Sequence, residues 1–420
     1  MRKDGIILKS VSVDRNIVTY NFEVRGCIKN LFATDKYFIE YAEDMSEVPI
    51  SILTIPFVSE MLPIIWLSDT VVWVEELDRT YYNCISQVKA AYQRLYEHVS
   101  LKGNVVAAKM PQNKVDGNDC VMLFGGGIDS HCTLQRIKQF HPTLITIQGW
   151  YHNLDEIIPA STSEIDYTKF VAKQQKVDSI CIKSNFAVLV NKPEFDKRFH
   201  KILHDSLWSG FQHSMEFISI ASAYCFKHNI PTIYIASSIP MGEYEMCGSH
   251  VTTDSEFRFA TNGQCIHDGS ELTRQDKVHV IIENCDKING KYPLKVCSFN
   301  DKNCCDCDKC FRSILGIVAE GGNIENFGFH IEGSLKEHWE KIFKDHGQKF
   351  NIRGESSLHW PAIRRRMLEN YDNILYKDFA DWFMNFDFLS AQKKALKRYY
   401  RQNFREILSR KIKQHLTNNG

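Results

Sequence analysis

Three consecutive glycines followed by Ile128, Asp129 and Ser130 make up a segment whose residue types and spacing suit it to chemistry. The segment lies between a short apolar stretch, 120–124, and an amphipathic stretch that begins at Ser130. Glycines at a strand-to-helix turn permit positive φ and let the backbone approach a ligand closely. Free N–H groups and the dipole at the start of a helix then favour an anion. The segment therefore predicts a phosphate-binding loop.

This loop differs from two common phosphate-binding patterns. No lysine follows the glycines, as the Gly-x-x-x-x-Gly-Lys-Ser/Thr motif of many ATPases and GTPases requires. Asp129 and Ser130 occupy the later positions of a Gly-x-Gly-x-x-Gly pattern. A glycine triplet alone is also typical of an ordinary tight turn. A ligand-binding interpretation therefore needs a second feature of the chain in its support.

A group of cysteines supplies that second feature. It consists of Cys297, Cys304, Cys307 and Cys310, with Cys-x-x-Cys-x-x-Cys spacing in its last three members. This spacing lets one turn present several thiolates to one ion, and four sulfurs favour tetrahedral zinc. An iron–sulfur cluster accepts the same ligands, and a register with Cys305 in place of Cys304 has poorer spacing. Closed four-cysteine zinc sites hold folds together, so we expect a structural role.

Together the two features resemble the PP-loop ATP pyrophosphatase superfamily and, within it, the QueC family of 7-cyano-7-deazaguanine synthases. The order of residues in 123–130 is similar to that family's Ser-Gly-Gly-x-Asp-Ser loop, with Gly125 at the position of its first serine. The cysteine quartet, followed by Arg312, is similar to its zinc segment. The resemblance covers 116–325, about half of the chain.

Three intervening segments extend the resemblance. Residues 266–278 resemble the family's segment that ends in a substrate-side lysine. Residues 248–250 and the pair Thr253 and Asp254 are similar to segments of larger QueC-like proteins, which occur in phage-defence operons (QatC-like) and in biosynthetic clusters. The resemblance implies an α/β fold, with a PP-loop (adenine nucleotide α-hydrolase-like) parallel sheet and flanking helices.

The resemblance also implies ATP, Mg²⁺ and Zn²⁺ as cofactors. The expected nucleotide-binding residues are Phe124, Gly125, Gly126, Gly127, Ile128, Asp129, Ser130 and Gln148. The expected catalytic residues are Asp129, Ser130, Arg274 and Lys277. N–H groups of the last two glycines and the Ser130 hydroxyl would bind the departing pyrophosphate with donors fixed before the reaction. Asp129 would help to hold Mg²⁺ or would cap the helix that follows.

Arg274 and Lys277 are the best candidate cations for the α-phosphate or a substrate carboxylate. The alternative for both is a solvated surface helix. The reaction implied by the resemblance is that of an ATP-dependent ligase that forms a carbon–nitrogen bond through an acyl-adenylate. A deazaguanine-like carboxylate is joined to AMP, and pyrophosphate leaves. Ammonia or an amine then attacks the acyl-adenylate. The amine can belong to a protein partner in antiviral defence.

Two other functional classes stay open. The first is an RNA-modifying PP-loop enzyme of the tRNA-thiolation type, which would need a reactive Cys132 close to ATP. The second is a non-catalytic QueC-like scaffold in a defence complex, in which Gly125 marks lost turnover. Salt-dependent RNA binding would favour the first class, and partner binding without ATP turnover would favour the second.

Composition indicates an enzyme of the cytoplasm. The 420 residues, 44% hydrophobic and 24% charged, suffice for one large core and smaller ones. With 51 basic and 51 acidic residues the net charge is zero, which argues against a global field for nucleic acid or membranes. No uninterrupted apolar stretch reaches the ~18 residues of a membrane helix, and the start lacks a secretory signal. Fourteen cysteines with a metal-like quartet fit a reducing compartment.

Hydrophobic patterning divides the chain into four regions: a β-rich domain with strands throughout (1–76), a helix (77–101) and linker that end at 118, the PP-loop domain (119–330) and a helical extension (331–420). Strands are expected at 120–124, 143–150, 179–182 and 232–237, with a long helix around 217–224. Ligands bind at the carboxyl ends of such strands. Those ends carry 125–130, 148–150, 183–185 and 237–238.

The carboxyl-terminal region changes composition. From Ala391 to Gly420 there are nine Lys and Arg residues and one acid, Glu406. The aromatic residues within or just before this stretch are Trp382, Phe383, Phe386, Phe388, Tyr399, Tyr400 and Phe404. One interpretation is RNA binding with stacked aromatics. We favour the other, an amphipathic helix whose aromatics pack inward, because the overall charge is balanced. A protein partner or a small anionic substrate could also meet this surface.

Overall fold

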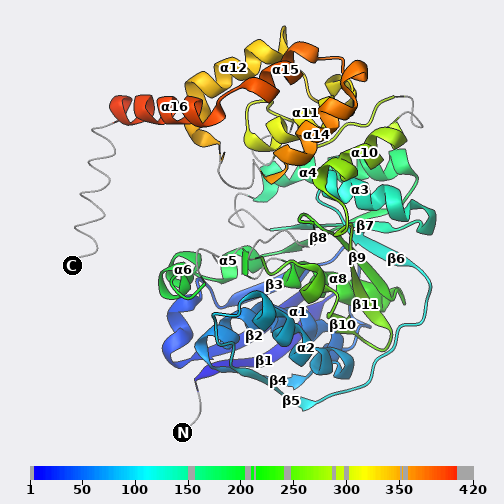
Figure 1. Ribbon diagram of the computed structural model, residues 1–420. Coiled ribbons are helices and arrows are strands. Elements are labelled where there is room, and N and C mark those ends of the chain that lie inside the picture. Colours follow the sequence, from blue (N-terminus) through cyan, green and yellow to red (C-terminus); the bar gives the residue numbers. More distant parts are fainter. Residues whose placement is uncertain are drawn as a thin grey trace. The chain divides into compact units, whose positions relative to one another are not determined.

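The computed structural model describes residues 4–149, 157–203, 210–211, 214–240, 247–285, 290–297, 302–350, 352 and 358–403 (Figure 1). The chain forms two compact units, Met1–Leu272 and Thr273–Gly420. The boundaries expected at 76 and 118 fall inside the first unit, and the boundary expected at 330 falls inside the second.

One eleven-stranded sheet forms the described framework of the first unit. Its strands are β1 (Gly5–Asp14), β2 (Ile17–Arg25), β3 (Lys36–Glu40), β4 (Val71–Glu76), β5 (Asn104–Lys109), β6 (Cys120–Leu123), β7 (Thr143–Gln148), β8 (Ser179–Ser184), β9 (Thr232–Ala236), β10 (Arg258–Phe259) and β11 (Gly263–Asp268). Their order in space is β10-β11-β9-β6-β7-β8-β3-β2-β1-β4-β5.

The sheet is mostly parallel. Strands β11, β9, β6, β7 and β8 form a parallel half, and β1, β4 and β5 are parallel to one another. Antiparallel pairing of β3 with β8, through Ile39 and Ser184, joins the amino-terminal strands to the parallel half. The predicted α/β class is therefore confirmed, and the region expected to be a separate β-rich domain shares its sheet with the region of the glycine loop.

Helices cover both faces of the parallel half. The helices of the first unit are η1 (Gly26–Leu31), α1 (Ile50–Ser68), α2 (Arg79–Leu95), α3 (Ile128–Ile137), η2 (Lys138–Phe140), α4 (Ile157–Gln175), α5 (Phe186–Leu189), α6 (Lys192–Phe199), α8 (Met215–Lys227) and α9 (Val251–Asp254). Helices α3 and α4 pack on one face around Met122 and Leu144. Helices α1, α2 and α8 share a larger core with the other face, which includes Val121 and Ile145. Both faces of β6 are thus buried.

Helix α1 corrects the prediction of strands throughout 1–76. It is a helix of 19 residues that is buried on nearly every side and contains Pro56 and Pro63. A helix surrounded by core has no polar face, so its sequence lacks the helical period that separates a helix from a buried strand. It is long and apolar enough to cross a membrane, but 89% of its most apolar window is buried inside the protein, as in a core helix.

The other elements expected before residue 240 are largely confirmed. The predicted strands correspond to β6, β7, β8 and β9, and the predicted helices to α2 and α8. Trp150, expected at the end of β7, lies outside the described residues. Strands β5, β10 and β11 were not predicted. Strand β5 occupies part of the stretch taken as a linker, because its six residues alternate too weakly to signal a strand.

The described part of the second unit consists of helices around an aromatic core. They are α10 (Arg274–Cys285), α11 (Asp308–Ala319), η4 (Ile324–Phe327), α12 (Leu335–His346), η5 (Gly347–Lys349), α14 (Trp360–Glu369), η6 (Tyr371–Asn373), α15 (Lys377–Asn385) and α16 (Phe388–Gln402). The ring of Phe311 lies within 6.4 Å of seven aromatic rings, centroid to centroid. Trp382, Phe383 and Phe388 pack inward as expected, whereas Tyr399 and Tyr400 are exposed.

Candidate functional site

The glycine loop follows β6 at the point where the sheet changes direction. From β6 the chain passes through α3 to β7 on one side, and later from β8 through α8 to β9 on the other side of β6. The helices of these two connections pack on opposite faces of the sheet, α3 on one and α8 on the other. In open parallel sheets, ligands bind in the crevice at such a switch point.

The backbone of the loop is shaped for close approach. The N–H of Phe124 donates to the Ile145 carbonyl at 2.9 Å, which ties the start of the loop to β7. Gly126 has φ +75°, a left-handed conformation that favours glycine. A Cβ atom added to Gly125 or Gly127 would meet no heavy atom of the described chain within 4 Å. Two of the three glycines thus border open space, as a binding loop requires.

Helix α3 begins directly in this loop. Gly127 is its N-cap residue, and a glycine supplies no side-chain cap. Asp129 lies in the first turn, where the helix dipole stabilises a carboxylate. The Ser130 hydroxyl donates to the Gly127 carbonyl at 3.0 Å. To bind an anion as expected, that hydroxyl would have to turn away from Gly127.

His131 adds a buried imidazole beside the loop. Its Nε2 lies 2.6 Å from the Tyr167 hydroxyl, and its ring meets Phe124 edge to face at 5.1 Å between centroids. Burial lowers the pKa of His131 to about 3. The imidazole is therefore neutral at pH 7 and contributes packing, not positive charge, to the loop.

An acidic residue on a distant strand anchors α3, and sequence reasoning did not find it. Asp268, the last residue of β11, accepts hydrogen bonds from Thr133 at 2.8 Å and from Arg136 at 3.1 Å. Thr133 and Arg136 are three residues apart and therefore share one face of α3. That shared polar face was the available signal, but its partner is more than 130 residues away.

His267, the residue before Asp268 on β11, belongs to a second buried network, which is centred on Asp254. Asp254 accepts hydrogen bonds from His267 Nδ1 at 2.7 Å, from Ser249 at 3.1 Å and from Ser214. Both Asp254 and His267 have side chains only 3% exposed. The segments around Ser249 and Asp254 that resemble QueC-like proteins are therefore fixed to the end of β11, close to the edge that carries the glycine loop.

The remaining predicted site residues lie in two places. Gln148 ends β7 in the first unit, where it is buried and pairs with Lys183 of β8. Arg274 and Lys277 belong to α10 in the second unit, and both side chains are buried. The alternative of a solvated surface helix is therefore wrong for these two cations.

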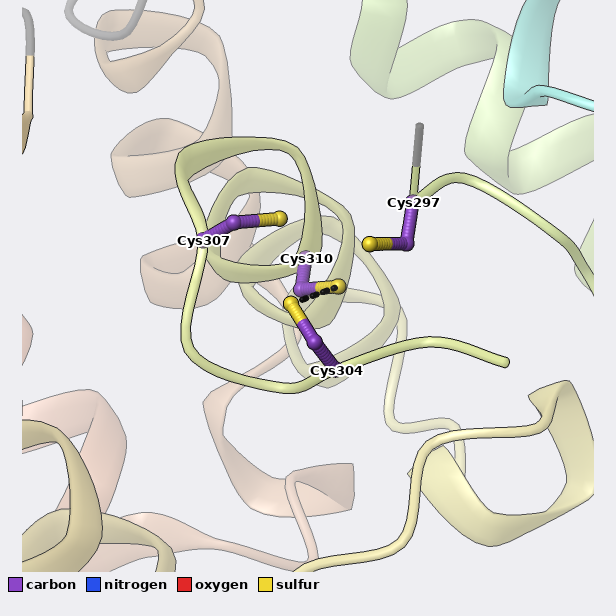
Figure 2. Close-up of side chains that lie close together, drawn as sticks. All are labelled: Cys297, Cys304, Cys307 and Cys310. Carbon is purple, nitrogen blue, oxygen red and sulfur yellow. Dashed lines mark hydrogen bonds between the residues drawn. The ribbon is translucent and has the colours of Figure 1, made fainter. Parts of the chain in front are cut away.

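The four predicted cysteines converge in the second unit, and Figure 2 shows their sulfurs turned toward one another. All four Sγ atoms lie within 4.8 Å of one another, and those of Cys304 and Cys310 are 3.9 Å apart. Tetrahedral zinc, with Zn–S bonds of about 2.3 Å, requires sulfurs about 3.8 Å apart. The quartet could therefore bind a metal such as zinc. A hydrogen bond from Cys310 lowers the pKa of Cys307 to about 5, as suits a thiolate ligand.

Neighbouring groups hold the quartet in place. Asn303 Oδ1 accepts from the N–H of Cys297 at 3.3 Å, while Asn303 Nδ2 donates to the Leu294 and Gly328 carbonyls at 2.8 and 3.1 Å. The remaining cysteine, Cys305, has φ +57° and directs its thiol to the Asn303 carbonyl. The register that uses Cys304 is thus confirmed, and Cys305 serves the turn.

Comparisons with protein-family models and with curated proteins found no match for this chain.

Proposed function

We propose that this protein is an ATP-dependent ligase of QueC type, which forms AMP and pyrophosphate while it activates a deazaguanine-like carboxylate. The single observation that carries the proposal is the glycine loop at the switch point of a parallel sheet, with open space at Gly125 and Gly127. The geometry by itself suits any anion. The resemblance of 123–130 to the PP-loop suggests that the anion is the pyrophosphate part of ATP.

In the proposed reaction a carboxylate oxygen of the substrate attacks the α-phosphorus of ATP. The bond from that phosphorus to the bridging oxygen breaks, and pyrophosphate departs with the bonding electrons. Ammonia or an amine then attacks the acyl carbon, loses a proton and expels AMP. N–H groups of Gly126 and Gly127 at the start of α3 would stabilise the pyrophosphate charge. Asp129 would hold Mg²⁺, which neutralises phosphate charge when bound.

The resemblance assigns Arg274 and Lys277 to the α-phosphate or the substrate carboxylate, a role that stays a prediction. We also propose zinc as the ion of the cysteine quartet, because four sulfurs form a closed, structural type of site. None of the fourteen cysteines forms a disulfide, which supports a reducing compartment such as the cytoplasm. Cys132 is buried, which counts against the thiolation alternative.

A pyrophosphate-release assay with Mg-ATP, with and without carboxy-deazaguanine, tests the proposal. We expect pyrophosphate and AMP only when the carboxylate is present, and a rate about 100-fold lower in Asp129→Ala. Asp14→Ala, which removes an exposed carboxylate at the end of β1, is the matched control and should keep the rate. If the protein binds ATP but releases no pyrophosphate under any condition, the ligase proposal is wrong and the non-catalytic scaffold is favoured.

A further inference from the structure

Helix α16 carries charge of only one sign. Its 15 residues include no acid. Its five cations are Lys393, Lys394, Lys397, Arg398 and Arg401. Three pairs of them stand four residues apart, so that like charges face each other along the helix and destabilise it. Helix α12, which packs against α16, instead mixes three lysines with three acids. The unbalanced charge of α16 is therefore a local property, in a chain whose net charge is zero.

The second half of α16 has no buried side chain after Ala395, although the Arg398 guanidinium donates to the Lys344 carbonyl of α12. Phe388 and Ala395 are its buried residues, and every side chain from Leu396 to Gln402 is exposed. Tyr399 and Tyr400 are 40% and 51% exposed, with their rings 6.1 Å apart between centroids. The sequence alone favoured a helix whose aromatic residues pack inward. The exposed Tyr399 and Tyr400, which lie beside cations, do not fit that interpretation.

The exposed residues are arranged in a row. Lys393, Lys397 and Arg401 are each four residues apart, and they line one hollow together with Leu396 and Tyr400. The row therefore places a cation about every 6 Å along the helix, from a rise of about 1.5 Å per residue. Cations that follow a backbone of phosphates, with aromatic rings on which bases stack, are the combination that single-stranded nucleic acids require.

We propose that α16 is a docking surface for single-stranded RNA. Phosphates would pair with the row of Lys393, Lys397 and Arg401, and unstacked bases would stack on Tyr399 and Tyr400. Neither an acidic amphipathic helix nor a lipid surface fits as well. Both need a continuous apolar stripe, and Lys393 interrupts the exposed stripe between Leu389 and Leu396. The proposal does not rest on the ligase activity.

Fluorescence anisotropy of the full chain with a fluorescein-labelled 20-nucleotide oligouridine tests this proposal. The triple variant Lys393→Gln, Lys397→Gln, Arg401→Gln should bind about tenfold more weakly at moderate salt. The slope of log affinity against log salt should also fall by about 2, as expected for three lost phosphate contacts on a single strand. The control Lys336→Gln, Lys341→Gln, Lys344→Gln removes the same charge from α12 and should change neither quantity.

A second pair of variants tests the stacking. Tyr399→Ala, Tyr400→Ala should weaken binding about tenfold without a change in the salt slope, whereas Tyr399→Phe, Tyr400→Phe should bind like the natural protein. Equal losses in the α16 and α12 triple variants would overturn the proposal, as would no binding at low salt. Binding to vesicles that contain phosphatidylserine, or to an acidic amphipathic peptide, in place of RNA would also overturn it and reassign the surface.

Discussion

At the scale of single residues, the three glycines of the loop have different roles. Gly126 is required by the backbone, since φ +75° strains any residue that has a Cβ atom. Gly125 and Gly127 have no such requirement, and both border open space. The serine of the PP-loop pattern would therefore fit at Gly125, and its absence removes one hydroxyl donor without a change in the shape of the loop.

The variant Gly125→Ser follows from this difference. It should leave the free energy of unfolding within about 0.5 kcal/mol of the natural protein, because a Cβ atom at this position meets no described heavy atom within 4 Å. The added hydroxyl should tighten ATP binding up to about tenfold, the effect of one hydrogen bond to a charged group. Thermal unfolding and titration with ATP measure the two effects.

Gly126→Ser is the matched control for that variant. It introduces the same side chain one residue later, at a left-handed position, and should destabilise the protein by about 1–2 kcal/mol. Equal destabilisation by both variants would show that the space beside Gly125 is filled. A stable Gly125→Ser protein that binds ATP no more tightly would show that the departure from the family pattern has no cost in affinity.

At the scale of elements, α1 and α8 bury a pair of acids at their contact. Glu60 of α1 and Glu216 of α8 are fully buried, their side chains hydrogen-bond to each other, and Tyr37 donates to Glu216. Burial raises the pKa of Glu216 to about 8. The other titratable groups that interact with this pair are Tyr20, Tyr37, Tyr41, Tyr81 and Lys192. The pair is thus set to keep a proton at neutral pH.

This shared proton makes stability depend on pH. The unfolded chain releases the proton above its ordinary pKa of 4.5, whereas the folded chain keeps it up to about 8. The contribution of Glu216 to the free energy of unfolding is therefore full below pH 4.5 and is lost as the pH rises to about 8. Glu216→Gln, a neutral isostere of the protonated acid, should flatten this dependence in urea unfolding between pH 5 and pH 9.

Glu164→Gln on α4 is the control for the buried pair, because its side chain is exposed and should leave the pH dependence as it is. If the stability of Glu216→Gln depends on pH as steeply as that of the natural protein, the proton responsible for the dependence is bound by another group. The variant should also unfold at a higher urea concentration than the natural protein at pH 9, where Glu216 of the natural protein has largely lost its proton.

How far the elements could be predicted depended on whether their signals are local. The glycine loop, β6 to β9 and the cysteine quartet rest on patterns within a few residues, and the structure has them where they were expected. Helix α1 has no polar face to give it a period. The anchoring of α3 by Asp268 depends on a residue on a strand far away in the sequence, which no local pattern of α3 contains. The predictions thus failed where burial or distance removed the signal.

At the scale of the whole molecule, long-range pairing decided how the chain divides. The pairing of β3 with β8 joins two regions of different pattern into one sheet, and residue 118 lies inside the first unit. The cysteine quartet, expected in the same domain as the glycine loop, lies in the other unit. The loop and the candidate metal site therefore depend on different cores, which leads to a testable difference in stability.

Metal removal should unfold the second unit and spare the first. Structural zinc contributes about 10–16 kcal/mol of binding free energy, as much as the whole stability of a typical domain. Phe311, next to Cys310, lies at the centre of the aromatic core, so loss of the metal should loosen that core. Limited proteolysis with mass spectrometry, before and after chelation, should show new cleavage within 273–403 while 4–149 stays protected.

Two neighbouring cysteines provide the matched variants for that experiment. Cys307→Ser removes a ligand and should lose the metal, about one equivalent by elemental analysis, together with protection of the second unit. Cys305→Ser removes a thiol that lies outside the quartet and should keep both. Loss of protection in both units at once would mean that they unfold as one. Unchanged protection after complete metal loss would mean that the aromatic core is stable by itself, and the structural role of the metal would then be wrong.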